Sequence, residues 1–394
     1  MSSFSVILKA RRTPIGSFLG NFSSLSASDL ASFVIKDILK DKRLNPNVIN
    51  EIILGNVLSA GQGQAPARQA ALKGGCTDSI EALTINKMCG SGLKAVMLAD
   101  QALRAGDSDI ILAGGMESMS NTPHLHINSR KETKLGHFEL IDSLVHDGLW
   151  DVYTQQHMGS CAELLVTERN YSREDQDKFA IQSYSKAYKA YEKNLLENEV
   201  VPISISNSKG ENILISKDEE PFKAKIGKVP HLKPAFKKGG TITAANASKL
   251  NDGAAVLLIT NEYEAKKLGI KPLAKILAHA SVAHEPERFT SAPGKAIKKV
   301  LSKANLSIDS IDLWEVNEAF AAVAMAVIDD FRIPTERINI YGGAVALGHP
   351  IGASGARILT TLLTGMKNKK AKKGLATICI GGGEASAIIV ENYD

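Results

Sequence analysis

The chain has 394 residues, a length that predicts two or three folding units. Hydrophobic residues make up 44% and charged residues 23%, a balance that is typical of a globular protein and excludes a mainly disordered one. The longest apolar run, Ala319 to Ile328, has ten residues, far fewer than the roughly 20 of a membrane-spanning helix, so we expect no membrane partner. Four cysteines in so long a chain do not suggest a secreted disulfide scaffold. We expect a soluble protein of a reducing compartment, the cytoplasm, with the mitochondrion as the alternative.

The net charge of +5 suits a polyanionic small molecule but does not indicate nucleic acid. The densest basic run, Lys367 to Lys373, contains no aromatic residue, and aromatic residues are only 5% of the chain. Nucleic-acid grooves usually interleave stacking rings with positive charges. We therefore expect this run to be a solvated helix end and expect no nucleic-acid partner.

Strand-like and helix-like segments alternate along the chain. Short apolar runs bounded by Gly, Asn or Asp predict buried strands; they lie at residues 6–8, 51–54, 109–113, 256–259, 376–379 and 385–390. Helical periodicity predicts a helix from Ser91 to Arg104 with Gly106 as its stop, and a capping box at Ser172 predicts another to about Tyr191. This alternation indicates an α/β fold with a parallel or mixed sheet.

Three motifs recur in the same order at a nearly constant shift. The segment ending at Asn56 resembles the one ending at Asn317 (a shift of 261), and Ser91-Gly92 resembles Ser354-Gly355 (a shift of 263). The segment ending at Glu117 resembles the one ending at Glu384 (a shift of 267). The repetition predicts a duplicated half, with similar α/β domains at the two ends of the chain.

The duplication suggests where the domains begin and end. We expect one half to comprise residues 1–120 and 250–270, and the other to comprise residues 271–394. Residues 121–249 are more polar and have little strand character. A long insertion of this kind usually acts as a lid or a binding wall.

Cys89 stands in the segment Asn86-Lys-Met-Cys-Gly-Ser-Gly92, where a predicted strand turns into a predicted helix. Free backbone N–H groups and the positive end of the helix dipole favour a thiolate at such a position. Gly90 and Gly92 would let a substrate approach the backbone closely. The segment by itself is equally compatible with a nucleophile and with an ordinary buried cysteine.

His349 lies in a glycine-rich loop just before a predicted helix, and the crowded glycines favour a catalytic histidine over a structural one. With the shift of 263, Asn86 and Cys89 correspond to His349 and Gly352. The candidate nucleophile and the histidine thus occupy equivalent turns, which a pseudo-twofold arrangement of the halves would bring face to face.

Two further candidates follow predicted strands. Cys379 precedes three glycines, and because another strand follows them we expect a chain reversal beside a thiol and not a phosphate loop. Asn317 follows an apolar strand at whose carboxyl end α/β ligand sites cluster, although a simple helix cap is the alternative. The histidines form no HExxH pair, so we expect no catalytic transition metal.

Taken together, these segments resemble the thiolase family over essentially the whole chain. The motifs that carry the resemblance are Arg12-Thr-Pro-Ile-Gly16, Asn86-Lys-Met-Cys-Gly-Ser-Gly92, Ala113-Gly-Gly-Met-Glu117, Asn317-Glu-Ala-Phe320, Gly348-His-Pro350 and Cys379-Ile-Gly-Gly-Gly383. Within the family, the likeness is greatest to acetoacetyl-CoA thiolases of the mitochondrial type. The resemblance implies two duplicated α/β core domains with mixed five-stranded sheets, plus an inserted loop domain that binds coenzyme A.

The resemblance also implies an activity, the reversible Claisen condensation of two acetyl-CoA to acetoacetyl-CoA and CoA. In the family's scheme Cys89 is acylated, His349 is its general base, and Cys379 moves a proton at the substrate's α-carbon. Backbone N–H groups of Cys89 and Gly381 would hold one thioester oxygen, and His349 with a water on Asn317 would hold the other. The scheme needs no covalent cofactor.

Ligand contacts are implied by motif match. The residues expected to contact coenzyme A are Tyr184, Lys223, Lys228, Leu232, Ser248, His157, Met158 and Phe320. Relatives usually carry Arg where Lys223 stands, which puts a bidentate phosphate contact in doubt. Potassium would be bound by Tyr184 and by main-chain oxygens of Ala244, Ala245, Ala247 and Val345.

Substrate range and assembly complete the expectations. His157 and Met158 on one side and Phe289 on the other match positions that crowd the acyl pocket in short-chain relatives, although they could instead only fill core. A broader-chain 3-ketoacyl-CoA thiolase is the main alternative. A ketoacyl synthase lacks the Cys379 motif, and a noncatalytic acyl-CoA-binding relative would have lost a reactive residue. We expect a homotetramer built from dimers.

Overall fold

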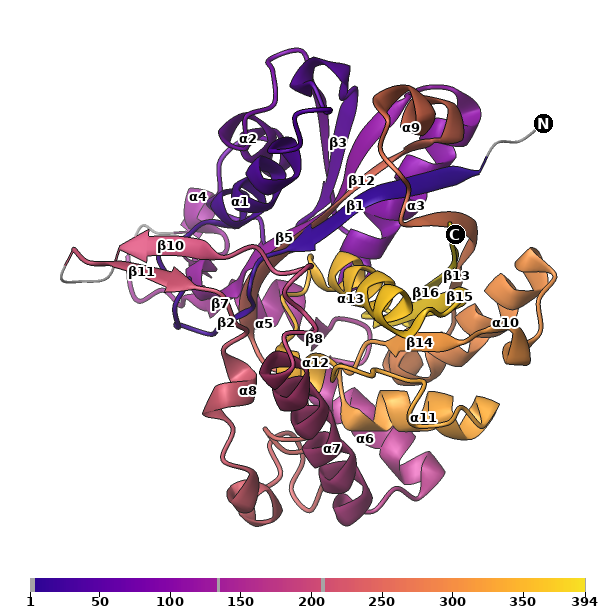
Figure 1. The fold of residues 1–394 in the computed structure, drawn as a ribbon. Helices are drawn as coiled ribbons and strands as arrows, with labels where there is room; N and C mark the ends of the chain where they lie inside the picture. Colours follow the sequence, from indigo (N-terminus) through magenta and orange to yellow (C-terminus); the bar gives the residue numbers. More distant parts are fainter. Residues whose placement is uncertain (1–3, 133–134, 207–209, 394) are drawn as a thin grey trace.

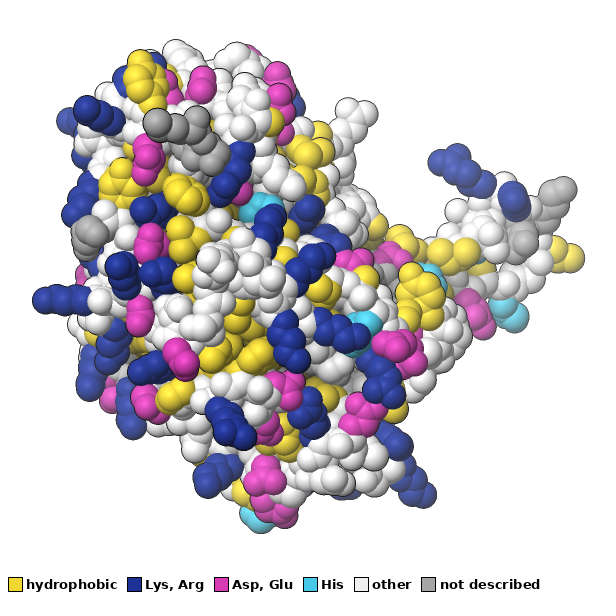
Figure 2. All heavy atoms as spheres, turned by 90° about the vertical axis from the view of Figure 1, so that its right-hand side faces the viewer, with side chains coloured by type: hydrophobic (Ala, Val, Ile, Leu, Met, Phe, Trp, Pro, Cys, Tyr) yellow, Lys and Arg dark blue, Asp and Glu magenta, His cyan; other side chains and the backbone are white. Residues whose placement is uncertain are grey.

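The computed structural model describes residues 4–132, 135–206 and 210–393. Within those ranges, no helix is both long enough and apolar enough to cross a bilayer. On the face shown in Figure 2, lysines and arginines are interspersed with acidic and apolar side chains and form no continuous basic stripe.

Five main strands belong to the N-terminal half, and their directions are mixed. In sheet order they are β1 (Ser5–Arg12), β12 (Asn251–Asn261), β5 (Ile110–Ser118), β3 (Glu51–Gly55) and β4 (Glu81–Ile85), with the short β2 (Gly16–Ser17) beside β12. The first three are antiparallel, and the last three run parallel. One face packs against α1 (Ala27–Leu39), α2 (Pro66–Lys73) and α9 (Glu262–Leu268), and the other against α3 (Ser91–Ala105).

The C-terminal half repeats this plan. Its strands in sheet order are β13 (Ala274–Ala283), β16 (Glu384–Asn392), β15 (Lys373–Ile380) and β14 (Leu313–Val316), after which Ile338 forms a single parallel bridge to Trp314. One face packs against α10 (Ala292–Ala304) and α11 (Ala321–Phe331), and the other against α13 (Ser354–Lys369). The two sets of strands join edge to edge through a two-residue pairing of β1 with β13, so one ten-stranded sheet runs through the molecule (Figure 1).

The sequence repeat is confirmed as a structural repeat. β3 corresponds to β14 and β5 to β15, and α3 and α13 begin at the two serines that the shift had aligned, Ser91 and Ser354. These two helices pack together over the same face of the sheet. Their backbones meet at glycine, because a Cβ added at Gly355 would lie 2.3 Å from the Leu93 nitrogen. Only a residue without a side chain permits this approach.

The segment between β5 and β12 carries long helices and three short hairpins that the sequence did not predict. The helices are α6 (Met158–Arg169) and α7 (Arg173–Glu192), with the short α4 (Ser129–Glu132), α5 (Ser143–Gly148) and α8 (Glu220–Lys223). The hairpins pair β6 (His124–Leu125) with β7 (Ile141–Asp142), β8 (Trp150–Asp151) with β9 (Gln156–His157), and β10 (Ile203–Ser206) with β11 (Asn212–Ile215). The predicted capping box is confirmed, since Ser172 and Asp175 bond each other reciprocally at the start of α7.

The basic run also lies where it was expected. Lys367 and Lys369 are exposed in the last turn of α13, and Lys370 ends the helix in the left-handed conformation. Lysines near the last carbonyls of a helix complement its dipole. The run is therefore a solvated helix end as far as Lys370, whereas Lys373 begins β15 and pairs with Glu391 at 3.0 Å.

Candidate active site

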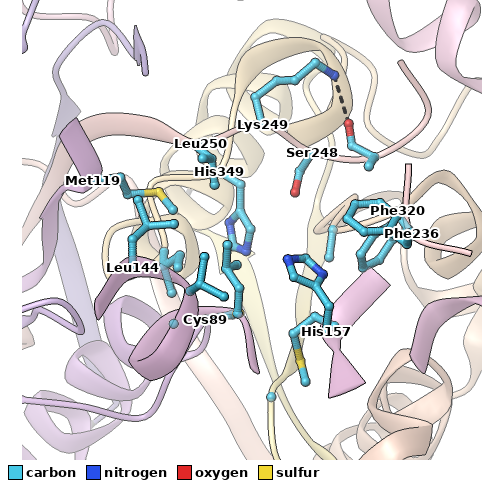
Figure 3. Close-up of a pocket in the computed structure, with 18 of the residues that line it drawn as sticks. Cys89, Met119, Leu144, His157, Phe236, Ser248, Lys249, Leu250, Phe320 and His349 are labelled. Atoms are coloured by element: carbon cyan, nitrogen blue, oxygen red, sulfur yellow. Dashed lines mark hydrogen bonds between the residues drawn. The ribbon is translucent and has the colours of Figure 1, made fainter. Parts of the chain in front are cut away.

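A cavity of about 450 Å³ lies where the turns of the two halves meet the inserted segment. Its walls are mainly apolar. The predicted catalytic and coenzyme A-contacting residues among its lining are Cys89, His157, Met158, Ser248, Phe320, His349 and Gly381, and Ala244 and Ala247 of the predicted potassium site also line it. Cys89 and His349 point into this one cavity from different halves (Figure 3). The structure thus brings together the two reactive residues that the repeat had placed on equivalent turns.

Cys89 stands on a strained turn between β4 and α3. The preceding residue, Met88, has a φ of +47°, a left-handed backbone conformation that residues other than glycine rarely adopt. Ser91 holds the turn closed, because its Oγ accepts from the Lys87 N–H at 2.8 Å and donates to the Met88 carbonyl at 2.7 Å. Residues kept in such conformations cluster at functional sites.

The thiol of Cys89 is protonated in the resting pocket. Burial raises its pKa to about 11, while the backbone N–H groups of Gly381 and of Cys89 itself oppose the shift. A base is therefore required before the sulfur can attack a carbonyl. The same two N–H groups converge where negative charge would develop during acyl transfer.

His349 is held as a neutral base. Its backbone N–H donates to Asn251 Oδ1 at 2.8 Å, and its Nδ1 lies 2.5 Å from Ser354 Oγ. Because Ser354 donates its own proton to the Pro350 carbonyl, Nδ1 of the imidazole must be the donor to Ser354, which leaves Nε2 as an acceptor. Burial, with a contribution from nearby Arg357, lowers the pKa of His349 to about 3.

Cys379 lies at the end of β15, next to the turn that carries Gly381. Its side chain is fully buried and does not line the cavity. Burial raises the pKa of Cys379 well above its ordinary value, and the Cys89 thiol adds to the shift. The residues that follow the two cysteines are in contact, because a Cβ built on Gly90 would lie 2.3 Å from Ile380 Cδ1. Two protonated thiols on opposite turns are a suitable pair for separate acyl and proton transfers.

Asn317 carries an unusual buried amide. Both its Oδ1 and its Nδ2 lack a hydrogen-bond partner among the described residues. Its counterpart in the other half, Asn56, instead donates to Glu117 at 2.7 Å. A buried amide left without partners is costly unless water or a ligand satisfies it. The Asn317 side chain is fully buried and is not among the residues that line the cavity, so a buried water is the ligand that suits its amide.

An aromatic wall closes the side of the cavity formed by the inserted segment. The His157 ring stacks on Phe236 with centroids 4.9 Å apart, and Phe320 meets the edges of Phe236 and Phe289 at 6.0 and 6.4 Å. The sequence did not predict a role for Phe236, because a lone phenylalanine in a loop-like segment carries no pattern. Met158 lies on the same side, and its sulfur is 3.6 Å from the position of a Cβ built on Gly381.

The remaining residues predicted to contact coenzyme A lie outside this cavity. Lys223 and Lys228 are exposed, and Lys223 pairs with Glu219 at 2.5 Å. Leu232 follows the 3-10 helix η3 (Ile226–His231). Tyr184 is buried on α7 and faces a second hollow that Pro221 and Phe222 also line.

The residues predicted to hold potassium do not fit an added ion. The ammonium of Lys249 donates to the carbonyl of Ala247 at 2.9 Å (dashed line in Figure 3). It also donates to the carbonyl of Val345 at 3.4 Å. It also lies 5.6 Å from the ring centre of Tyr184. Three of the five predicted ligands therefore already surround a side-chain cation. Burial lowers the pKa of Lys249 to about 8, while the carboxylates of Glu220 and Glu318 oppose the shift.

Comparison with known proteins agrees with this architecture. The family described as "Thiolase, N-terminal domain" matches residues 5–263, and "Thiolase, C-terminal domain" matches residues 270–392. A probable acetyl-CoA acyltransferase of Staphylococcus aureus is 49% identical over 389 residues, which cover 98% of this chain and 99% of the relative.

Two solved structures are similar over nearly their whole length. The acetyl-CoA acetyltransferase of Bacillus anthracis has a TM-score of 0.96 at 37% identity, with 99% of each chain covered. Acat5 thiolase from Ascaris suum, in complex with coenzyme A, has a TM-score of 0.93 at 44% identity, covering 99% of this chain and 100% of that one.

The fold and the paired turns define an acyltransferase with its candidate nucleophile at the junction of two duplicated halves. The matches cover both halves and most of the chain. The chain belongs to the thiolase family.

The cysteines should differ sharply in their reaction with iodoacetamide. Cys89 is partly exposed in the cavity, whereas Cys76, Cys161 and Cys379 are buried, so Cys89 should be labelled first. Because its pKa is about 11, the thiolate fraction and the labelling rate should rise about tenfold per pH unit between pH 7 and 9. Peptide mass spectrometry measures both effects. A rate independent of pH would mean that the thiol is already ionised.

Proposed function

We propose that the chain is an acetyl-CoA C-acetyltransferase, which condenses two acetyl-CoA to acetoacetyl-CoA and CoA or runs the reverse thiolysis. The observation that carries the proposal is the meeting of Cys89, His349 and the Gly381 N–H in one apolar cavity, with the Cys379 thiol beside them. The relative solved with coenzyme A and the relatives named for acetyl-CoA support this substrate class.

In the first half-reaction, an acetyl group moves from CoA to the enzyme. The sulfur of Cys89 attacks the thioester carbonyl while Nε2 of His349 takes its proton. The new C–S bond forms, the bond to the CoA sulfur breaks, and His349 returns the proton to the departing thiolate. A neutral histidine is required for this step, and the low pKa of His349 provides it.

In the second half-reaction, a carbon–carbon bond forms. Cys379 first gives its thiol proton to Nε2 of His349 and then, as the thiolate, takes a proton from the methyl group of a second acetyl-CoA, whose carbanion attacks the acetyl carbonyl on Cys89. The bond from carbon to the Cys89 sulfur breaks, acetoacetyl-CoA is released, and His349 returns its proton to the Cys89 thiolate. Burial keeps the thiol of Cys379 neutral at rest, so it also suits the reverse role of proton donor in thiolysis.

Two oxyanion sites suit the two half-reactions. The N–H groups of Cys89 and Gly381 would stabilise the oxygen of the acyl group on Cys89, since both already act on its sulfur. His349, with a water on the unpartnered amide of Asn317, would stabilise the enolate oxygen of the second substrate.

Coenzyme A would enter along the inserted segment. Ser248, His157, Met158 and Phe320 line the cavity and would contact the pantetheine end. Further out, the exposed Lys223 and Lys228 would lie near its phosphates, with Tyr184 and Leu232 between the two regions. Lys223 must leave Glu219 to do so, and as a lysine it would act as a point charge.

Two alternatives are less well supported. A noncatalytic acyl-CoA-binding protein would not need two thiols and a neutral histidine around one cavity. A broader-chain 3-ketoacyl-CoA thiolase would need room beyond the acetyl group, where Phe289 and Met158 form the wall. We place the enzyme in the cytoplasm, in keeping with its four free cysteines.

Replacing Cys89 and replacing Cys379 should abolish different steps of the reaction. Cys89→Ala should abolish the covalent acetyl-enzyme formed from acetyl-CoA, because the acceptor sulfur is gone. Cys379→Ser should still be acetylated but should lose condensation by about 100-fold or more, as expected for a lost acid–base group. Intact-protein mass spectrometry and a condensation assay measure the two effects. The opposite pattern, acetylation in Cys89→Ala but not in Cys379→Ser, would reverse the roles.

Chain length should be restricted by the aromatic wall. Each methylene beyond the four-carbon 3-oxoacyl group would meet Phe289 or Met158 and would not gain the usual ~0.8 kcal/mol of burial. The enzyme should therefore cleave acetoacetyl-CoA with a much higher kcat/KM than 3-oxodecanoyl-CoA. Equal kcat/KM for both substrates would favour the broader-chain alternative and leave the Cys–His–Cys chemistry intact.

We also propose a homotetramer made of two dimers. Ile127, Leu135 and Phe138 are at least half exposed in the segment between β6 and β7, at 50%, 101% and 58%. Exposed apolar side chains gathered in one segment are typical of association surfaces. Light scattering at micromolar concentration should give a tetrameric mass, and Phe138→Glu should lower it to that of a dimer. A monomeric mass for the unaltered chain would refute both levels of assembly.

A further inference from the structure

Lys249 stands just before β12 and turns its side chain back across the preceding loop. Its Nζ donates to the carbonyl of Ala247 at 2.9 Å (dashed line in Figure 3) and also to that of Val345 at 3.4 Å. The ring of Tyr184 receives the same ammonium at 5.6 Å. These three groups come from the loop before β12, from the short helix α12 (Ala344–Leu347) and from α7. One cation therefore joins three elements that are far apart in the sequence.

This cation occupies the place in which a monovalent metal ion was expected. Carbonyl oxygens and an aromatic face are the groups that would bind potassium, and an ammonium carries the same single positive charge. Two such cations cannot share the carbonyls of Ala247 and Val345, because like charges at short range repel each other. The carboxylates of Glu220 and Glu318 supply the compensating negative charge nearby.

The joined elements border the proposed catalytic cavity. Ser248, beside Ala247, lines the cavity, and its backbone N–H donates to the Ala319 carbonyl at 2.9 Å. On the other side, α12 leads directly into Gly348 and His349. The Lys249 ammonium thus connects a wall that would face coenzyme A with the loop that carries the candidate base.

We propose that Lys249 is a positioning residue whose ammonium takes the place of a bound potassium ion, so that this enzyme works without potassium. The test of this inference by enzyme activity rests on the proposed function. The test by thermal unfolding rests only on the geometry around Lys249. A side-chain cation cannot dissociate, so the wall should keep its order in any monovalent salt.

The first experiment exchanges the salt around the unaltered enzyme. Thiolysis of acetoacetyl-CoA should vary by less than about twofold when potassium chloride is replaced by tetramethylammonium chloride at equal ionic strength. The midpoint of thermal unfolding should likewise not depend on which cation is present. A clear activation by potassium, or an unfolding midpoint raised by potassium but not by sodium, would overturn the proposal.

The second experiment compares two replacements of the lysine. Lys249→Ala removes the charge and opens space at the carbonyls, whereas Lys249→Met removes the charge but fills the space. Both should lose kcat/KM for CoA about tenfold or more in potassium-free buffer, because the wall is less well positioned. Potassium should restore Lys249→Ala and not Lys249→Met, a difference that a merely structural lysine would not produce. Lys267→Met, at an exposed lysine on α9, serves as the control.

The outcomes separate this inference from the proposed function. If no variant shows thiolysis but potassium selectively raises the unfolding midpoint of Lys249→Ala, the proposed function fails and the inference stands. If the enzyme is active but Lys249→Ala keeps full activity without potassium, the inference fails and the proposed function stands. If Lys249→Ala does not fold, the salt exchange on the unaltered enzyme still decides the question.

Discussion

One buried carboxylate holds the two halves of the catalytic region together. Glu117, at the end of β5, accepts hydrogen bonds from the Asn56 side chain at 2.7 Å and from the N–H groups of Val57 and Leu58 at 3.0 and 3.1 Å. It also accepts from the N–H of Gly352, in the loop of the other half, at 2.9 Å. Burial raises the pKa of Glu117 to about 7, although the hydrogen bonds from these donors lower it. A carboxylate with so many backbone donors fixes where the loop of His349 lies relative to Cys89.

A second buried cluster attaches the inserted segment to this frame. Arg12, fully buried at the end of β1, pairs with Glu199 at 2.6 Å and with Asp218 at 2.7 Å. Asp218 also accepts from the Ile15 N–H at 2.7 Å, so the turn after β1 and the insertion share one charge network. Arg12 thereby anchors the inserted segment to the first strand of the sheet. Removing one partner would leave an uncompensated buried charge.

The sequence predicted those parts of the molecule that local patterns determine. The strands of the two halves, the beginnings of α3, α13 and α7, and the repeat itself depend on apolar periodicity, glycine stops and capping boxes, all of which can be read along the chain. The meeting of Cys89 with His349 followed from the repeat, because equivalent turns of two halves face each other. The roles of these residues and the domain boundaries stay predictions.

Other parts could not be predicted, because they depend on contacts between distant segments. Carbonyl ligands leave no trace in side-chain identity, and nothing in the sequence around Lys249 indicated that its ammonium would reach Val345, 96 residues away. The stacking of Phe236 on His157 is equally nonlocal. Two of the short hairpins in the insertion have strands of only two residues, too short to show an alternating apolar pattern, and in the third only the four residues Ile203–Ser206 alternate.

The contact between the two halves also explains why equivalent positions of the repeat carry different residues. Gly352 is the counterpart of Cys89, and a Cβ placed there would lie 2.8 Å from both Glu117 Oε2 and the Met116 carbonyl. The contact that brings the halves together therefore leaves no room for a nucleophile on the second turn. A dimer of two identical half-chains would carry the same residue at the positions of Cys89 and Gly352. With cysteine at both positions the halves could not pack this closely, and with glycine at both positions the thiol would be missing. In a single polypeptide the two turns can carry different residues, so that Cys89 offers a thiol to the cavity while Gly352 keeps the two halves in close contact.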